Sequence, residues 1–187
     1  MSRRIIGIDP GLTRCGVGVV EVAANRQAKF VAVETLRSDA NLALAERINI
    51  IATELERILD LHKPELVAIE RVFSQQNVST VMGTAQISGV IMLLAERRGI
   101  PIQMHTPTEV KAAVTGSGRS GKLQVGTMVS KILGLKEIPK PADSADALAI
   151  AITAGWRATI ASENGVLTKA QAAWQSAEAA SKKIKKH

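Results

Sequence analysis

The sequence predicts an α/β domain with a mixed five-stranded sheet flanked by helices, and three observations lead to this prediction. Three short apolar segments open the chain and are joined in hairpin fashion, which favours antiparallel pairing. The apolar spacing then changes from that of a strand to that of a helix. Further apolar strands alternate with helices after that point, and a strand–helix–strand order gives parallel neighbours through a right-handed crossover.

The first three strands are expected at residues 4–8, 15–22 and 30–35. The first ends at Asp9-Pro10-Gly11, a sequence typical of a turn, and the second and third are joined near residues 24–26. Residues 41–61 should form an amphipathic helix, because apolar side chains recur at helical spacing at Leu44, Ile48, Ile51, Leu55 and Ile58. Pro64 ends that helix, and residues 66–69 form a buried strand that leads into Glu70.

The second half of the core alternates between helices and one more strand. A polar loop at residues 73–77 precedes a long helix that reaches about residue 98, and residues 100–104 form the fifth strand. A strong helix start follows this strand, because the N-cap, N1 and N3 positions are occupied by Thr106, Pro107 and Glu109. Residues 116–121 form a glycine-rich loop, and two more helices are expected at residues 122–133 and 143–155.

The positive charge of the chain is concentrated at its end. The formal net charge is +7, yet residues 157–187 hold six of the 24 Lys and Arg residues and only two of the 17 Asp and Glu residues. We therefore expect one domain at residues 1–156 and a basic, Ala- and Lys-rich tail at residues 157–187. A single cysteine indicates a reducing compartment, and the absence of a long apolar run indicates no membrane span, so a cytoplasmic location is expected.

Four carboxylates lie at the ends of predicted elements. Asp9 and Glu70 each follow an apolar strand, and Asp143 and Asp146 lie three residues apart at the start of the last helix. Each one alone has a structural explanation: a turn residue, a solvated strand end, an N-cap, or a favourable charge at a helix dipole.

Together the four acids point to a metal site. The carboxyl ends of neighbouring parallel strands meet at one edge of a sheet, so Asp9 and Glu70 should lie close together. Carboxylate oxygens suit Mg²⁺ or Mn²⁺, and two such ions can assist an in-line displacement at phosphorus. In a basic protein, this combination favours phosphodiester hydrolysis.

Several segments, spread in order over residues 4–156, resemble the RuvC family of bacterial Holliday-junction resolvases, which have an RNase H-like fold. They are Gly7-Ile8-Asp9-Pro10-Gly11, Ala68-Ile69-Glu70-Arg71-Val72-Phe73, Thr106-Pro107 with Glu109-Val110-Lys111, Val114-Thr115-Gly116, and Asp143-Ser144-Ala145-Asp146-Ala147-Leu148-Ala149. The resemblance implies a homodimeric, Mg²⁺-dependent endonuclease that nicks two opposed strands of a four-way DNA junction. It also implies cooperation with the RuvA–RuvB branch-migration complex.

The resemblance further implies roles for individual residues. Two Mg²⁺ ions, replaceable by Mn²⁺, would be held by the four acids, and Lys122 and Lys111 would lie near the scissile phosphate. Phe73 would stack on a base, and its loop would contact DNA through Gln75, Gln76 and Asn77. This loop lacks the basic residue often found before the Asn in the family, and the long helix has Ile87-Ser88 where an Arg is common.

Residues 116–122 nearly match a nucleotide-binding P-loop, but Leu123 replaces the required Ser or Thr and a helix, instead of a strand, is expected before it. A loop that places Arg119 and Lys122 on DNA phosphates fits better. Two other functions stay open from the residues alone. One is an actin- or sugar-kinase-like phosphotransferase, which would need a second domain, and the other is a junction-binding module without catalysis.

Overall fold

The computed structural model describes residues 2–71 and 78–163. The chain divides after Trp156 into two units, and the description below concerns the first. Its elements are, in order, β1 (Ser2–Asp9), β2 (Arg14–Ala23), β3 (Ala28–Arg37), α1 (Leu44–His62), β4 (Leu66–Glu70), α2 (Val78–Arg97), β5 (Ile102–His105), α3 (Pro107–Thr115), α4 (Lys122–Leu133) and α5 (Ala142–Glu163). Within residues 2–71 and 78–163, none of the helices has the length and apolar character that a membrane span requires.

The five strands form one mixed sheet in the order β3-β2-β1-β4-β5. β1 pairs antiparallel with β2, and β2 pairs antiparallel with β3, as the hairpin pattern predicts. β4 lies parallel to β1 and β5 lies parallel to β4. The predicted mixed five-stranded sheet is therefore confirmed, with the carboxyl ends of β1 and β4 side by side.

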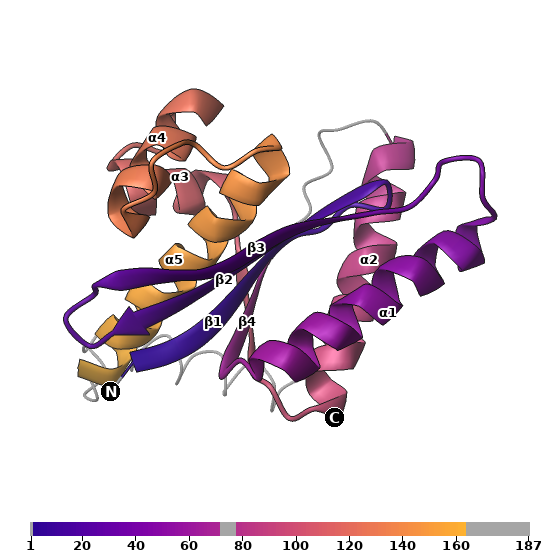
Figure 1. The fold of residues 1–187 in the computed structure, drawn as a ribbon, viewed down its shortest axis with the longest axis horizontal. Helices are drawn as coiled ribbons and strands as arrows, with labels where there is room; N and C mark the ends of the chain where they lie inside the picture. Colours follow the sequence, from indigo (N-terminus) through magenta and orange to yellow (C-terminus); the bar gives the residue numbers. More distant parts are fainter. Residues whose placement is uncertain (1, 72–77, 164–187) are drawn as a thin grey trace, which may run out of the picture. The chain divides into compact units, whose positions relative to one another are not determined.

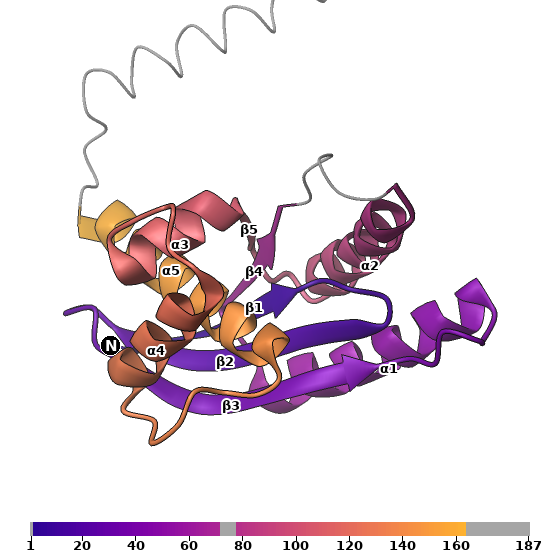
Figure 2. The same cartoon turned by 90° about the horizontal axis from the view of Figure 1, so that it is seen from above.

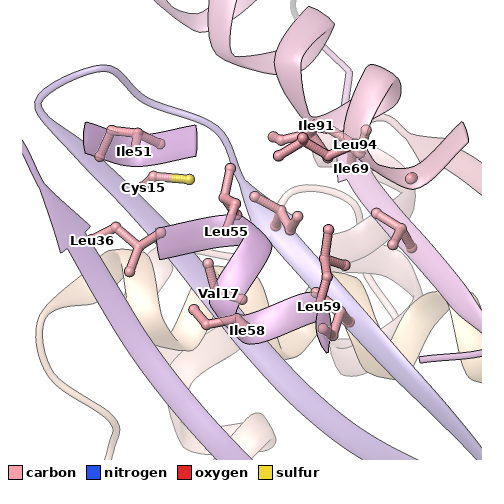
Figure 3. Packing of buried hydrophobic residues seen from close by; sticks show 14 of the residues in the cluster. Cys15, Val17, Leu36, Ile51, Leu55, Ile58, Leu59, Ile69, Ile91 and Leu94 are labelled. Atoms are coloured by element: carbon pink, nitrogen blue, oxygen red, sulfur yellow. The ribbon is translucent and has the colours of Figure 1, made fainter. Parts of the chain in front are cut away.

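Helices cover both faces of the sheet, with α1 and α2 on one face and α3, α4 and α5 on the other (Figure 1 and Figure 2). The α1–α2 side holds a core of fully buried aliphatic side chains, including Ile51 and Leu55 of α1 and Ile91 of α2 (Figure 3). The strands contribute Ile6, Ile8, Cys15, Val17 and Ile69 to it. Truncating one of these, as in Leu55→Ala, would cost about 2–5 kcal/mol.

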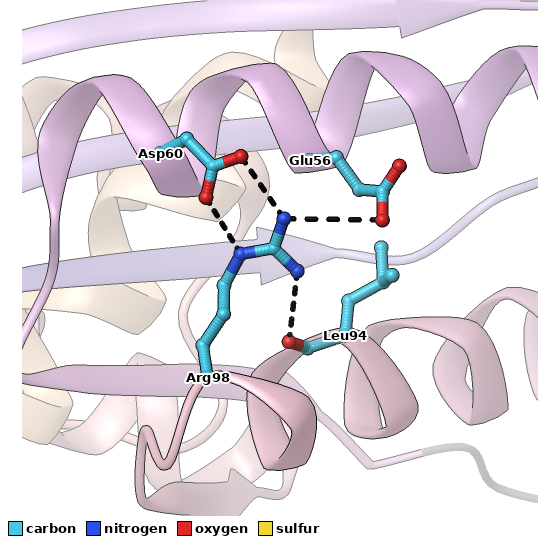
Figure 4. Close-up of polar contacts among 4 residues, drawn as sticks. All are labelled: Glu56, Asp60, Leu94 and Arg98. Atoms are coloured by element: carbon cyan, nitrogen blue, oxygen red, sulfur yellow. Dashed lines mark hydrogen bonds and ion pairs between the residues drawn. The ribbon is translucent and has the colours of Figure 1, made fainter.

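The ends of α1 and α2 are joined by one arginine (Figure 4). Arg98, which directly follows α2, places Nε 2.7 Å from Oδ1 and Nη2 3.0 Å from Oδ2 of Asp60 in α1. Its Nη1 also donates to the Leu94 carbonyl oxygen at 3.2 Å. The two-pronged contact fixes the C-terminal ends of both helices relative to each other.

Helix α5 packs directly on the backbone of the sheet, because glycines face it. A Cβ at Gly7 of β1 would overlap the carbonyl oxygen of Ala147, and one at Gly18 of β2 would lie 2.7 Å from the Leu148 nitrogen. Ala147 and Ala151 of α5 lie against Gly7, so the helix backbone can approach the strand closely at this point. This close approach brings the start of α5 to the end of β1.

The element boundaries differ from the predicted ones at the strand ends and at the end of α5, which reaches Glu163 where the prediction stopped at residue 155. β1, β2 and β3 each extend beyond their apolar segments, because the backbone ladder continues through exposed residues such as Arg3 and Arg14. The predicted helix start after Thr106 is confirmed: its hydroxyl accepts from the Glu109 N–H at 3.2 Å, and the Glu109 carboxylate accepts from the Thr106 N–H at 2.8 Å.

Candidate active site

Asp9, Glu70, Asp143 and Asp146 line a single cavity of about 790 Å³. Asp9 is the last residue of β1 and Glu70 the last of β4, and these parallel strands end next to each other. Asp143 and Asp146 lie in the first two turns of α5. The structure thus brings together the four acids that the sequence singled out, from two strands and one helix.

The position of α5 at this cavity depends on a row of residues across the sheet. Gly16 of β2 pairs with Asp9 on one side and with Thr35 of β3 on the other. A Cβ at Gly16 would overlap the Asp143 carbonyl oxygen. The hydroxyls of Thr35 and the buried Ser144 lie 3.0 Å apart and form a hydrogen bond. The row therefore fixes the first turn of α5 against the strand that carries Asp9.

The four acids repel one another in this cavity. Burial, followed by the charges of Glu70, Asp146 and Asp143, raises the pKa of Asp9 from 3.8 to about 7. The pKa of Glu70 is raised for the same reasons, first by burial and then by the charge of Asp146. Such a concentration of negative charge is costly unless cations lie nearby.

Two cationic side chains partly offset this charge. The Lys122 ammonium, at the start of α4, lies 3.3 Å from Oδ2 of Asp146, and the charge of Asp146 raises the pKa of Lys122. Nε of Arg14 lies 3.2 Å from Oδ2 of Asp143, although the angle does not make a hydrogen bond. Lys111 of α3 also lines the cavity and lowers the pKa of Glu70.

The donor set matches a hard divalent cation in its chemistry, because all four groups offer carboxylate oxygens. As they stand, no three His, Cys, Asp or Glu side chains within residues 2–71 and 78–163 are arranged so that they could hold a metal ion. Asp143 and Asp146 are instead paired with Arg14 and Lys122. Metal binding would therefore have to exchange these two ion pairs for metal contacts.

The structure places the other predicted site residues unevenly. Lys111 and Lys122 line the cavity, whereas Arg119 is exposed in the loop before α4 and does not line it. Phe73, Gln75, Gln76 and Asn77 lie outside the described residues. The segment before the glycine loop is helix α3, as expected, which is inconsistent with a P-loop.

Sequence reasoning missed three arginines that line the same cavity, namely Arg14, Arg47 and Arg71. Arg71 directly follows Glu70 and Arg14 lies five residues after Asp9, so closeness in sequence to the predicted acids was an available signal. Arg47 lies in α1 and reaches the cavity only through the fold, so no local pattern identifies it.

The sheet order, the crossover between β1 and β4 and the acids at the strand ends define an RNase H-like protein of the nuclease class. Comparison with known proteins specifies the family. Residues 5–154 match the family model for crossover junction endodeoxyribonuclease RuvC. This chain belongs to the RuvC family, whose members are metal-dependent nucleases.

Relatives of this family match nearly the whole chain. The crossover junction endodeoxyribonuclease RuvC of Paenarthrobacter aurescens is 56% identical over 96% of this chain and 97% of its own length. The protein of the same name from Pseudarthrobacter chlorophenolicus is 52% identical over 99% of this chain and 100% of its own. A kinase-like function is not favoured, since these relatives carry the nuclease name over their full length.

Solved structures agree with the family assignment. T. thermophilus RuvC in complex with a Holliday junction substrate superposes with a TM-score of 0.80 at 34% identity, covering 84% of this chain and 96% of that one. The yeast mitochondrial Holliday junction resolvase Ydc2 gives a TM-score of 0.60 at 14% identity, over 84% of this chain and 81% of that one, and supports the fold alone.

Proposed function

We propose that this protein resolves four-way DNA junctions by paired, metal-dependent nicking of two opposed strands. The observation that carries the proposal is the convergence of Asp9, Glu70, Asp143 and Asp146 in one cavity. Membership of the RuvC family supports the choice of a DNA junction as substrate. The reaction is hydrolysis of one phosphodiester bond in each of the two nicked strands.

The four acids are the proposed ligands of two Mg²⁺ ions, for which Mn²⁺ would substitute. When bound, such ions supply an activated water and stabilise the leaving oxygen. Their charge would also relieve the repulsion that raises the pKa values of Asp9 and Glu70. Lys122, released from Asp146, would then be free to face the scissile phosphate.

Cationic residues around the cavity are the proposed contacts to DNA. Lys122 would offset the charge that builds up on the phosphate during displacement, and Lys111 would assist from α3. Arg119 would bind a phosphate outside the cavity. The roles of Phe73, Gln75, Gln76 and Asn77 in base stacking and strand contact stay predictions, because these residues lie outside the described part of the chain.

Paired cuts need two sites related by a two-fold axis, so we propose a homodimer. Exposed apolar side chains on α2, namely Met82, Met92 and Leu93, support that helix as part of the interface. Residues 1–156 would form the nuclease domain, and the basic residues 157–187 would add affinity for DNA without choosing the substrate. A cytoplasmic location and cooperation with a RuvA–RuvB complex are also proposed, with family membership as their support.

The experiment compares a synthetic four-way junction with a linear duplex of the same sequence, each incubated with Mg²⁺ or with EDTA. We expect symmetric nicks on the junction only, and only with Mg²⁺. A separate sample with ATP should show no nucleotide turnover. Junction binding without any Mg²⁺-dependent nicking would reject the nuclease and leave the non-catalytic binding module.

A further inference from the structure

Several arginines in the described part of the fold are paired with carboxylates, whereas two arginines near the candidate active site, Arg37 and Arg47, are not. Arg57 contacts Glu34 and Glu54, and Arg98 contacts Asp60. Arg47, in contrast, makes its side-chain hydrogen bonds to two hydroxyl groups. Within residues 2–71 and 78–163, neither Arg47 nor Arg37 forms an ion pair, so both keep an unneutralised positive charge.

Arg14 and Arg37 line a second hollow next to the catalytic cavity, and Arg47, which lines the catalytic cavity, contacts Thr13 and Ser38 in the wall of that hollow. The hollow, of about 500 Å³, is lined by Thr13, Arg14, Arg37, Ser38 and Asp39. Thr13 and Arg14 line the catalytic cavity as well, so the two spaces adjoin. We call Arg14, Arg37 and Arg47 the arginine rim.

Two members of the arginine rim face each other across the sheet. Arg14 of β2 and Arg37 of β3 are direct partners in the antiparallel register. Like charges at directly opposed positions destabilise a strand pair, and an anion between them removes that cost. Nε of Arg14 lies 3.2 Å from Oδ2 of Asp143, so the charge of Arg14 is partly offset, whereas Arg37 is exposed.

The third member is held in place before any ligand binds. Nε of Arg47 donates to the Ser38 hydroxyl at 3.1 Å and Nη2 donates to the Thr13 hydroxyl at 2.8 Å. The Ser38 hydroxyl itself donates to the Leu12 carbonyl oxygen. These contacts use two of the five N–H donors of the guanidinium and fix its plane, which lowers the entropy cost of binding an anion.

One acid also lines the hollow. Oδ1 of Asp39 accepts a hydrogen bond from the backbone N–H of Asn41 at 2.9 Å, so this carboxylate is engaged in the turn before α1. The arginine rim therefore keeps an excess of positive charge next to a cavity lined by four acids. A chain of phosphates that passes from one to the other would meet cations in both spaces, because Lys111 and Lys122 line the catalytic cavity.

We propose that the arginine rim binds a backbone phosphate of the same DNA substrate, next to the phosphate placed at the catalytic cavity. The inference rests on the proposed function, since it takes DNA as the ligand. Planar guanidinium groups suit a phosphate because two parallel N–H donors match two of its oxygens. The arginine rim would raise the affinity for DNA and guide the path of the strand, and it would take no part in bond cleavage.

The test measures binding of a fluorescent four-way junction in EDTA, by anisotropy, at several salt concentrations. Arg37→Gln and Arg47→Gln should each weaken binding about 3- to 10-fold and flatten the slope of log K against log salt by about 0.9. Arg47→Lys, which keeps the charge, should keep most of the slope. Arg3→Gln is the matched control, because Arg3 is exposed at the opposite end of β1 and its loss changes the net charge equally.

The outcomes separate the two proposals. If Arg37→Gln and Arg47→Gln bind like Arg3→Gln, the arginine rim is not a phosphate site, even when the wild type nicks junctions. If the wild type fails to nick but both variants lose affinity, the nuclease proposal fails and the rim stands as a DNA-binding site. The Arg37 side chain makes no hydrogen bond or ion pair within residues 2–71 and 78–163, so the unfolding temperature of Arg37→Gln should match that of the wild type.

Discussion

The Lys122 ammonium lies 3.3 Å from Oδ2 of Asp146, so a cation of the protein sits among the four acids of the candidate active site. The carboxylates of Asp9 and Asp143 also raise the pKa of Lys122, which keeps the amine protonated at neutral pH. Lys122 begins α4 and Asp146 lies in α5, so the ion pair also connects two helices. When metal ions take the place of this ion pair, the ammonium would be free to stabilise negative charge on the reacting phosphate, because Lys122 also lines the cavity.

Replacing Lys122 should therefore affect catalysis more than binding. We expect Lys122→Met to lower the single-turnover nicking rate by about 10- to 100-fold, because a charge aimed at the reacting phosphate is lost. Lys122→Arg should recover part of that rate. Junction affinity in EDTA, measured on the same preparations, should change by less than about 5-fold, since one phosphate contact is removed. Equal losses of rate and affinity would assign Lys122 to binding alone.

Asp9 should make the metal-free protein less stable as the pH rises. Its pKa is about 7 in the fold but 3.8 in the unfolded chain, so the folded state binds the proton more tightly. The free energy of unfolding should then fall between about pH 4 and pH 7 and level off above that range. Asp9→Asn should raise it at pH 7.5 in EDTA by on the order of 1–3 kcal/mol.

Denaturant unfolding of both proteins at several pH values, with and without Mg²⁺, measures this effect. Mg²⁺ should stabilise the wild type more than Asp9→Asn, because binding to the native state adds stability by mass action. A variant that is less stable than the wild type in EDTA at pH 7.5 would contradict the repulsion described for the four acids.

Gly16 should be required for the position of Asp143. Gly16→Ala puts a methyl group on the Asp143 carbonyl oxygen and forces the start of α5 away from β1. We expect the nicking rate to fall at least 10-fold and the unfolding temperature to drop. Gly89→Ala is the matched control for stability, since nothing lies within 4 Å of its added Cβ. If Gly16→Ala nicks at the wild-type rate, the position of the start of α5 does not depend on this close contact.

Cys15 should be unreactive in the native protein. It is fully buried, and burial raises the pKa of its thiol to about 12, so almost no thiolate exists at pH 8. An alkylating reagent should modify it only after unfolding. Mass spectrometry should then show one label per chain. Rapid labelling of the native protein would mean that the core between β2 and α1 opens easily.

The sequence predicted the elements that rest on local patterns. The cap formed by Thr106 and Glu109, and the crossover that puts Asp9 beside Glu70, both appear in the structure. Long-range contacts were not predictable in this way. The role of Gly16 depends on the Asp143 carbonyl oxygen, 127 positions later in the chain, and nothing near Gly16 in the sequence indicates it.

The sequence also did not show which apolar side chains are buried in the core and which are exposed. Met82 and Met92 are apolar residues in the long helix α2, yet the structure leaves both exposed. Periodicity alone cannot separate a buried face from a face that awaits a partner. Arg47 shows the same limit for the site, because its hydroxyl partners Thr13 and Ser38 come from two separate loops.

The most direct test of the whole account is the single-turnover nicking rate of a four-way junction with Mg²⁺, for the wild type against Asp9→Asn and Glu70→Gln. Protein is kept in excess, and binding is measured in the same samples. We expect symmetric nicks by the wild type and a loss of at least 1,000-fold in both variants, because metal ligands are removed while the junction stays bound. Nicking within 10-fold of the wild type by either variant would contradict it.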